Sequence, residues 1–84
     1  MKIEVLGPGC SNCKKVEKDV FNALKELNIE AEVVKVTDLE KISSYGVLMT
    51  PGLVINGKVY SSGKIPVMET LKRWIEEENK KDNH

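Results

Sequence analysis

Residues 50–59 read TPGLVINGKV, and this stretch decides how the second half of the chain folds. Its Asn56-Gly57 pair lies between two strand-like segments, Leu53–Ile55 and Lys58–Ser61. An Asn-Gly pair in that setting is the strongest short-range signal for a β-hairpin. The stretch therefore predicts two antiparallel strands that begin next to Thr50-Pro51.

The first half of the chain predicts a strand, a helix and a second strand. Lys2–Leu6 alternates charged and apolar residues, and Ala31–Thr37 contains three valines, so both segments favour strands. Between them, apolar side chains recur at helical spacing as far as Leu27. Either Ser11 or Asn12 can cap the start of this helix.

Two more helices are predicted, one on each side of the hairpin. Leu39–Tyr45 follows Thr37 and Asp38, either of which can cap a short helix. After the hairpin, Gly63 interrupts the chain and Pro66 suits the first turn of a final helix. The buried stripe of this final helix is expected at Met68, Leu71, Trp74 and Ile75.

The predicted order is β-α-β-α-β-β-α, which indicates an α/β fold. The opening strand–helix–strand unit implies a right-handed parallel crossover, and the hairpin adds two antiparallel strands. We therefore expect one mixed four-stranded sheet flanked by helices on both faces. The 84 residues form a single domain, 1–84, in which about 78–84, including His84, are expected to be a frayed polar tail.

Charge and hydropathy exclude several classes of function. Thirteen basic and thirteen acidic residues cancel, so nothing indicates a surface for nucleic acid or for an anionic membrane. No stretch is long and apolar enough to span a bilayer, and the N-terminus lacks the apolar core of a secretory signal. We expect a monomeric, cytoplasmic protein without nucleic-acid or membrane partners.

The two cysteines of the chain, Cys10 and Cys13, are separated by two residues. In the cytoplasm such a pair favours catalysis or metal binding over a structural disulfide. Thiol–disulfide exchange needs one thiolate to attack and a second thiol to resolve the mixed disulfide. The predicted helix start stabilises a thiolate at Cys10, and Cys13 lies on the inward stripe. We therefore expect Cys10 to attack and Cys13 to resolve.

The chain resembles the small thioredoxin-like and glutaredoxin-like redox proteins of archaea and bacteria. The resemblance rests on GPGCSNC at residues 7–13, on TPGLVINGKV, and on Gly63 before the last helix. It implies a thioredoxin-like fold and a protein-disulfide reductase. It also implies that Thr50 and Pro51 form a cis peptide against the cysteines and align the substrate chain, while Gly63 keeps the substrate groove open.

The same resemblance implies the partners and the redox group. The redox group would be the Cys10–Cys13 disulfide itself, with no other cofactor and no metal. The substrates would be proteins that contain disulfides. Since the chain has no nucleotide-binding stretch, a separate disulfide reductase would have to supply the electrons.

Two features differ from the relatives or stay open. Ser11-Asn12 separates the cysteines, where thioredoxins carry Gly-Pro and glutaredoxins commonly carry Pro-Tyr, so their redox potentials do not transfer. Glu4 lies six residues before Cys10, the offset at which thioredoxins keep a buried acid for proton transfer. Alternatively, Glu4 faces water or pairs with Lys35 on the neighbouring strand.

The main alternative is a carrier of a soft metal ion such as copper(I), which two thiolates suit. Heavy-metal carriers also place a Cys pair between a first strand and a first helix. They continue as β-α-β-β-α-β, however, whereas this chain predicts an extra helix at Leu39–Tyr45 and ends in a helix. A structural zinc site is not expected, because zinc normally takes four ligands and the chain offers the two cysteines and His84.

Overall fold

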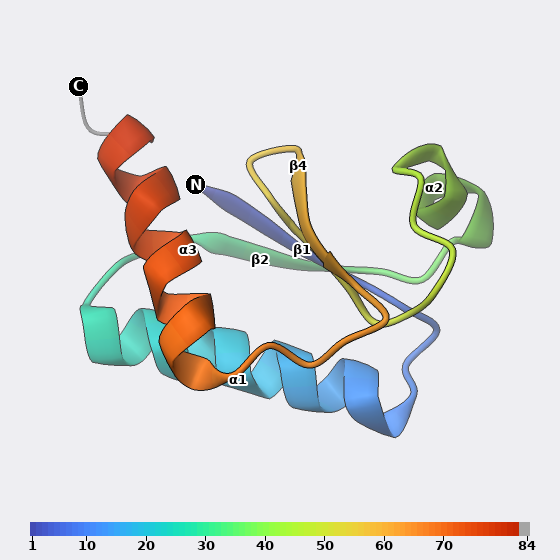
Figure 1. Ribbon diagram of the computed structural model, residues 1–84, viewed down its shortest axis with the longest axis horizontal. Coiled ribbons are helices and arrows are strands. Elements are labelled where there is room, and N and C mark those ends of the chain that lie inside the picture. The colour runs from blue at the N-terminus through green and yellow to red at the C-terminus, as the bar shows by residue number, and fades with distance from the viewer. Residues whose placement is uncertain (83–84) are drawn as a thin grey trace.

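The computed structural model describes residues 1–82 and has the predicted order of elements (Figure 1). The bounds of the elements before the last helix agree with the predicted ones to within about one residue. The elements are β1 (Lys2–Leu6), α1 (Ser11–Leu27), β2 (Glu32–Val36), α2 (Leu39–Ser44), β3 (Gly52–Ile55), β4 (Lys58–Ser62) and α3 (Met68–Asp82). The α/β, thioredoxin-like fold class is confirmed. None of the described helices is long and apolar enough to cross a membrane.

The four strands form one mixed sheet in the order β2-β1-β3-β4. β1 runs parallel to β2 and antiparallel to β3, so the first strand of the chain lies inside the sheet. β3 and β4 form the predicted hairpin, in which Asn56 and Gly57 have φ angles of 52° and 81°. Positive φ at both turn residues matches the right-handed twist of the strands.

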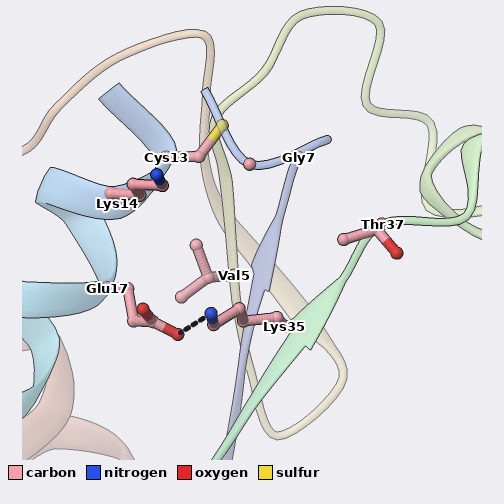
Figure 2. Close-up of a pocket in the computed structure, with 8 residues that line it drawn as sticks. Val5, Gly7, Cys13, Lys14, Glu17, Lys35 and Thr37 are labelled. Atoms are coloured by element: carbon pink, nitrogen blue, oxygen red, sulfur yellow. Dashed lines mark ion pairs between the residues drawn. The ribbon is translucent and has the colours of Figure 1, made fainter. Parts of the chain in front are cut away.

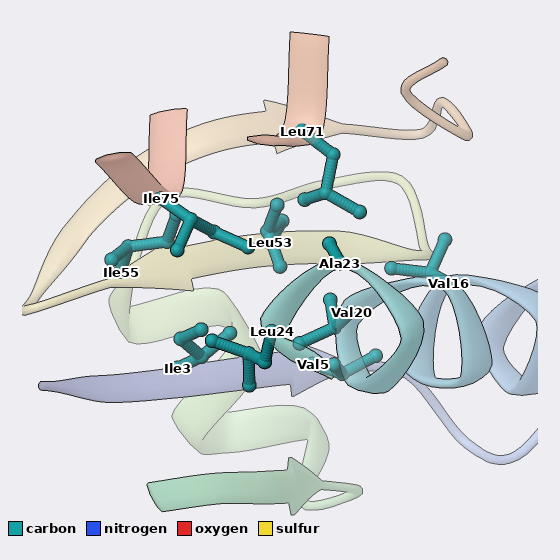
Figure 3. Packing of buried hydrophobic residues seen from close by; sticks show 10 residues of the cluster. All are labelled: Ile3, Val5, Val16, Val20, Ala23, Leu24, Leu53, Ile55, Leu71 and Ile75. Atoms are coloured by element: carbon teal, nitrogen blue, oxygen red, sulfur yellow. The ribbon is translucent and has the colours of Figure 1, made fainter. Parts of the chain in front are cut away.

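Side chains alternate across the sheet and divide the core into two parts. Ile3 and Val5 pack with residues of α1 and α3, whereas Leu6 packs with Ile42 of α2 and Glu4 accepts a hydrogen bond from Tyr45 at the end of α2. Figure 3 shows the larger cluster, which is formed by Ile3, Val5, Val16, Val20, Ala23, Leu24, Leu53, Ile55, Leu71 and Ile75. The smaller cluster under α2 is formed by Leu6, Val36, Ile42, Val47 and Val54.

Residues 78–82, which the sequence analysis expected to belong to a frayed polar tail, are helical in the structure, where α3 continues to Asp82. The reason is Glu78, whose side chain is buried. Its carboxylate accepts hydrogen bonds from the Tyr60 hydroxyl, from Asn56 Nδ2 at 3.3 Å and from Lys81 Nζ at 3.2 Å. These bonds attach the polar end of α3 to the hairpin. His84 lies outside the described residues.

Trp74 attaches the middle of α3 to the same hairpin. Its ring centroid lies 5.3 Å from that of Tyr60, and the two planes are inclined by 43°. The sequence predicted Trp74 in the buried stripe of the last helix. Its side chain is only half-buried, so its contact with Tyr60 lies at the edge of the core. Tyr60 therefore both packs against Trp74 and donates to Glu78.

We predict that Glu78→Gln lowers the free energy of unfolding at neutral pH by about 1–3 kcal/mol, because the amide loses charge-assisted hydrogen bonds. The hydrogen bond from Tyr60 lowers the pKa of Glu78 from its ordinary value of 4.5 in the folded protein. The stability that this carboxylate contributes is therefore complete above pH 4.5 and is lost as pH falls through the lower folded value. Denaturant unfolding over an acid pH series measures both effects.

Glu76→Gln is the matched control, since Glu76 is an exposed glutamate on the same helix. It should leave both the stability and its pH dependence close to wild type. Burial, and next the hydrogen bond to Glu78, raises the pKa of Tyr60 to about 12. The stability that the protonated Tyr60 hydroxyl contributes is therefore complete below pH 10, and it is lost as pH rises through 12. Equal acid sensitivity in wild type and Glu78→Gln would contradict this description of the contact.

Candidate functional site

Cys10 and Cys13 form a disulfide where β1 passes into α1, with their Cα atoms 5.1 Å apart. The N-cap of α1 is Cys10 itself, whereas the sequence favoured Ser11 or Asn12. The Cys10 sulfur accepts a hydrogen bond from the backbone N–H of Cys13 at 3.3 Å. After reduction, the same N–H and the positive end of the helix stabilise a thiolate on Cys10.

The two sulfurs differ in access to solvent. Cys10 is exposed, whereas only 5% of the surface of Cys13 is exposed. An external disulfide can therefore reach Cys10 and cannot reach Cys13 without a change of structure. Cys13 begins the buried stripe of α1, which continues with Val16 and Val20. The difference supports attack by Cys10 and resolution by Cys13.

Gly7 forms the wall against which the disulfide packs, a role that the sequence analysis missed. A Cβ on Gly7 would overlap the Cys13 sulfur, and it would lie 3.3 Å from Cys13 Cβ and 3.6 Å from Thr50 Cβ. Gly7, Cys13 and Thr50 therefore surround one point. The Gly7 N–H donates to the Val36 carbonyl at 2.9 Å, which holds this wall to β2. The only signal in the sequence was a glycine at the end of the strand that precedes the cysteines.

The Thr50–Pro51 peptide bond is cis, and Pro51 is buried. The Gly63 N–H donates to the Pro51 carbonyl at 2.8 Å, so the structure brings Gly63 beside this loop. Gly63 has a φ of 73°, and a Cβ there would lie 2.8 Å from Met49 Cβ. Both the backbone angle and the close approach exclude a larger residue at this position.

Glu4 is buried, and it lies on the face of the sheet opposite α1. The Tyr45 hydroxyl donates to its two carboxylate oxygens at 2.7 and 2.9 Å. The pKa of Tyr45 is raised, chiefly by this hydrogen bond to Glu4, next by burial and then by the charge of Glu4. The expectation that Glu4 faces water or pairs with Lys35 is wrong. Its role in proton transfer stays a prediction, which a position across the sheet from α1 does not favour.

A small cavity of about 40 Å³ lies behind Cys13 (Figure 2). Two of the residues that line it form an ion pair that the sequence analysis missed, between Lys35 Nζ and Glu17 Oε2 at 3.6 Å. The only signal in the sequence for a position of Glu17 near the cysteines was its spacing, four residues after Cys13. The cavity is lined by Val5, Gly7, Gly9, Cys13, Lys14, Glu17, Lys35 and Thr37.

Among residues 1–82, no three His, Cys, Asp or Glu side chains gather closely enough to hold a metal ion. The chemistry that the arrangement itself provides is that of the sulfurs. One is exposed at a helix start, and the other is buried beside a glycine.

Comparison with known proteins agrees with this geometry. Residues 1–76 match the model of a family described as thioredoxin domain. The chain is 37% identical over 75 residues to a thioredoxin of Methanothermobacter thermautotrophicus, a match that covers 89% of this chain and 97% of the relative. It is 40% identical over 73 residues to a thioredoxin of Methanocaldococcus jannaschii, covering 87% of this chain and 84% of the relative.

We predict that Gly7→Ala lowers the stability of the oxidised protein by about 1–3 kcal/mol, because its methyl group overlaps the Cys13 sulfur. The control is the same substitution in a Cys13→Ala background, where the sulfur is gone. Gly7→Ala should cost clearly less there, and the four proteins form a double-mutant cycle measured by urea unfolding. The same cost in both backgrounds would show that Gly7 does not pack against that sulfur.

Proposed function

The chain belongs to the thioredoxin domain family, and from this premise we propose that it reduces disulfides in other proteins through Cys10 and Cys13. The observation that carries the proposal is the difference between the two sulfurs. Cys10 is an exposed N-cap, and it is joined to a buried partner on the next turn of the helix. This arrangement offers one thiolate for attack and one thiol for resolution.

In the proposed reaction, the Cys10 thiolate attacks one sulfur of the substrate disulfide. The substrate S–S bond breaks, its electron pair leaves on the second substrate sulfur, and a mixed disulfide with Cys10 remains. Cys13 then attacks the Cys10 sulfur and displaces the first substrate sulfur. The substrate gains two electrons and two protons, and Cys10 and Cys13 become a disulfide.

We place the substrate chain across the loop that contains Thr50 and Pro51. Thr50 adjoins Gly7 and Cys13, and the Pro51 carbonyl is bound by Gly63. The residues just before them, Leu48 and Met49, are exposed over 91% and 66% of their surfaces. These apolar side chains support docking of a polypeptide next to the sulfurs.

The electrons come from a separate disulfide reductase, which reduces the Cys10–Cys13 disulfide after each turnover. We propose that the protein acts as a monomer in the cytoplasm and uses the disulfide as its only redox group. The copper-carrier alternative is not carried forward. In this chain α2 stands between β2 and β3, whereas that class of carrier continues from its second strand directly into a third.

The two cysteine variants should fail at different steps. Cys10→Ser should abolish reduction of insulin disulfides, because the remaining thiol is buried. Cys13→Ser should react once and stop as a mixed disulfide, since no second thiol is left to resolve it. Turnover assays and intact-protein mass spectrometry measure these outcomes. A stable mixed disulfide on Cys13 in the Cys10→Ser variant would reverse the assigned roles.

A further inference from the structure

The tip of the β3–β4 hairpin, Asn56-Gly57, contains two groups that can react with each other. The backbone nitrogen of the residue after an asparagine can attack the carboxamide carbon of that asparagine, which closes a five-membered succinimide ring. Glycine offers the least steric resistance to this attack, because it has no side chain. Both residues of the tip are exposed. The hairpin therefore contains a pair that can change its own covalent structure without an enzyme.

The folded protein holds the Asn56 carboxamide at both of its ends. Its Oδ1 accepts a hydrogen bond from the Lys2 backbone N–H at 3.0 Å, and its Nδ2 donates to Glu78 Oε1 at 3.3 Å. Asn56 is also in the left-handed conformation of the turn, with a φ of 52°. The closed ring requires a different backbone ψ at this residue, so the turn must open before the reaction can proceed.

Glu78 connects α3 to the two sides of this turn. Its buried carboxylate accepts a hydrogen bond from Asn56 at the tip and another from the Tyr60 hydroxyl on β4. The ends of helices open at a lower free energy than the core does, and α3 ends four residues after Glu78, at Asp82. Opening of this helix end therefore releases the reactive side chain and the neighbouring strand together.

We propose that Asn56 is a site of spontaneous covalent modification: it deamidates when the polar end of α3 leaves the hairpin, and the carboxylate that forms then keeps α3 from returning. Neither event requires the redox reaction of the cysteines. The modification needs water as its only other reactant.

The reaction balances without an oxidant or a reductant. The Gly57 nitrogen forms a bond to Asn56 Cγ, the bond from Cγ to Nδ2 breaks, and ammonia leaves. One water molecule then opens the ring at either of its two carbonyl carbons. The product is aspartate, or isoaspartate, in which the main chain runs through the former side chain. Both products have a carboxylate where the amide was.

The new carboxylate meets an unfavourable neighbour. In the native contact Asn56 Nδ2 donates to Glu78 Oε1, and deamidation replaces that donor by a second negatively charged acceptor. Two carboxylates at hydrogen-bond distance repel each other. Lys81, which pairs with Glu78 at 3.2 Å, would then face two carboxylates. Return of α3 to the hairpin is therefore disfavoured once the modification has occurred.

Mass spectrometry of the full chain, incubated at neutral pH and digested with trypsin, measures the first event. The tryptic peptide of residues 42–58 contains Asn56 as its only asparagine. Wild type should deamidate about a hundredfold more slowly than a synthetic peptide of residues 52–60, because two hydrogen bonds hold its side chain. Glu78→Ala should deamidate about tenfold faster than wild type, because one of these bonds is lost.

Two controls separate local opening from a general loss of stability. Glu76→Ala changes an exposed glutamate on the same helix, and it should keep the wild-type rate. Ile42→Val creates a small cavity under α2, away from the hairpin, and lowers the stability that urea unfolding measures. It should also deamidate at close to the wild-type rate.

Hydrogen exchange of residues 76–82 measures the second event. Asn56→Asp has the carboxylate of the product on an unchanged main chain, and it should raise exchange in this segment about tenfold. Adding Glu78→Gln exchanges the positions of amide and carboxylate, so the double variant should regain much of the protection. Asn22→Asp, at an exposed asparagine of α1, should leave exchange in this segment unchanged.

Three results would overturn the inference. The first is equal deamidation rates in wild type and in the synthetic peptide. The second is the same acceleration in Ile42→Val as in Glu78→Ala, which would mean that deamidation follows global unfolding. The third is wild-type exchange of residues 76–82 in Asn56→Asp, or no recovery of protection when Glu78→Gln is added.

Discussion

Close packing of the Cys13 sulfur against Gly7 is the constraint on which the site depends. Since Gly7 has no side chain, α1 can begin directly beside the end of β1, with Thr50 at the same point. The Gly7 N–H is bound by Val36, so the wall belongs to the sheet and is not a free loop. The start of α1, the end of β1 and the Thr50-Pro51 loop therefore meet at one place. The helix start provides the two sulfurs, the strand end provides Gly7, and the loop provides Thr50 beside them.

Two buried carboxylates hold the rest of the fold around this point. Burying a charge is costly unless it is hydrogen-bonded, and both are. Glu4 is bound by Tyr45 at the end of α2, the helix that leads into the Thr50-Pro51 loop. Glu78 is bound by Tyr60 and Asn56 of the hairpin, which fixes α3 against β4. A chain of this size has a thin apolar core, so such polar contacts carry much of the specificity of the arrangement.

The two faces of the sheet have different tasks. The α1 and α3 face contains most of the apolar core, together with the cavity of Cys13, Glu17 and Lys35. The α2 face contains the smaller cluster and the Glu4–Tyr45 pair. Because successive residues of β1 point to opposite faces, Val5 lies by the cavity and Glu4 lies away from it. A shift of one residue in β1 would therefore exchange the faces on which Val5 and Glu4 lie.

The sequence alone determined the order of elements, the hairpin at Asn56-Gly57 and the position of the cysteines at a helix start, because all three depend on local signals. A periodic apolar pattern or an Asn-Gly pair acts over a few residues and needs no knowledge of the sheet. Tertiary structure alone decided the position of Glu4, the pairing of Lys35 with Glu17, the role of Gly7 and the extension of α3 through Glu78. Each joins residues distant in the chain or depends on which face of the sheet a helix covers, and the strand order β2-β1-β3-β4 sets both.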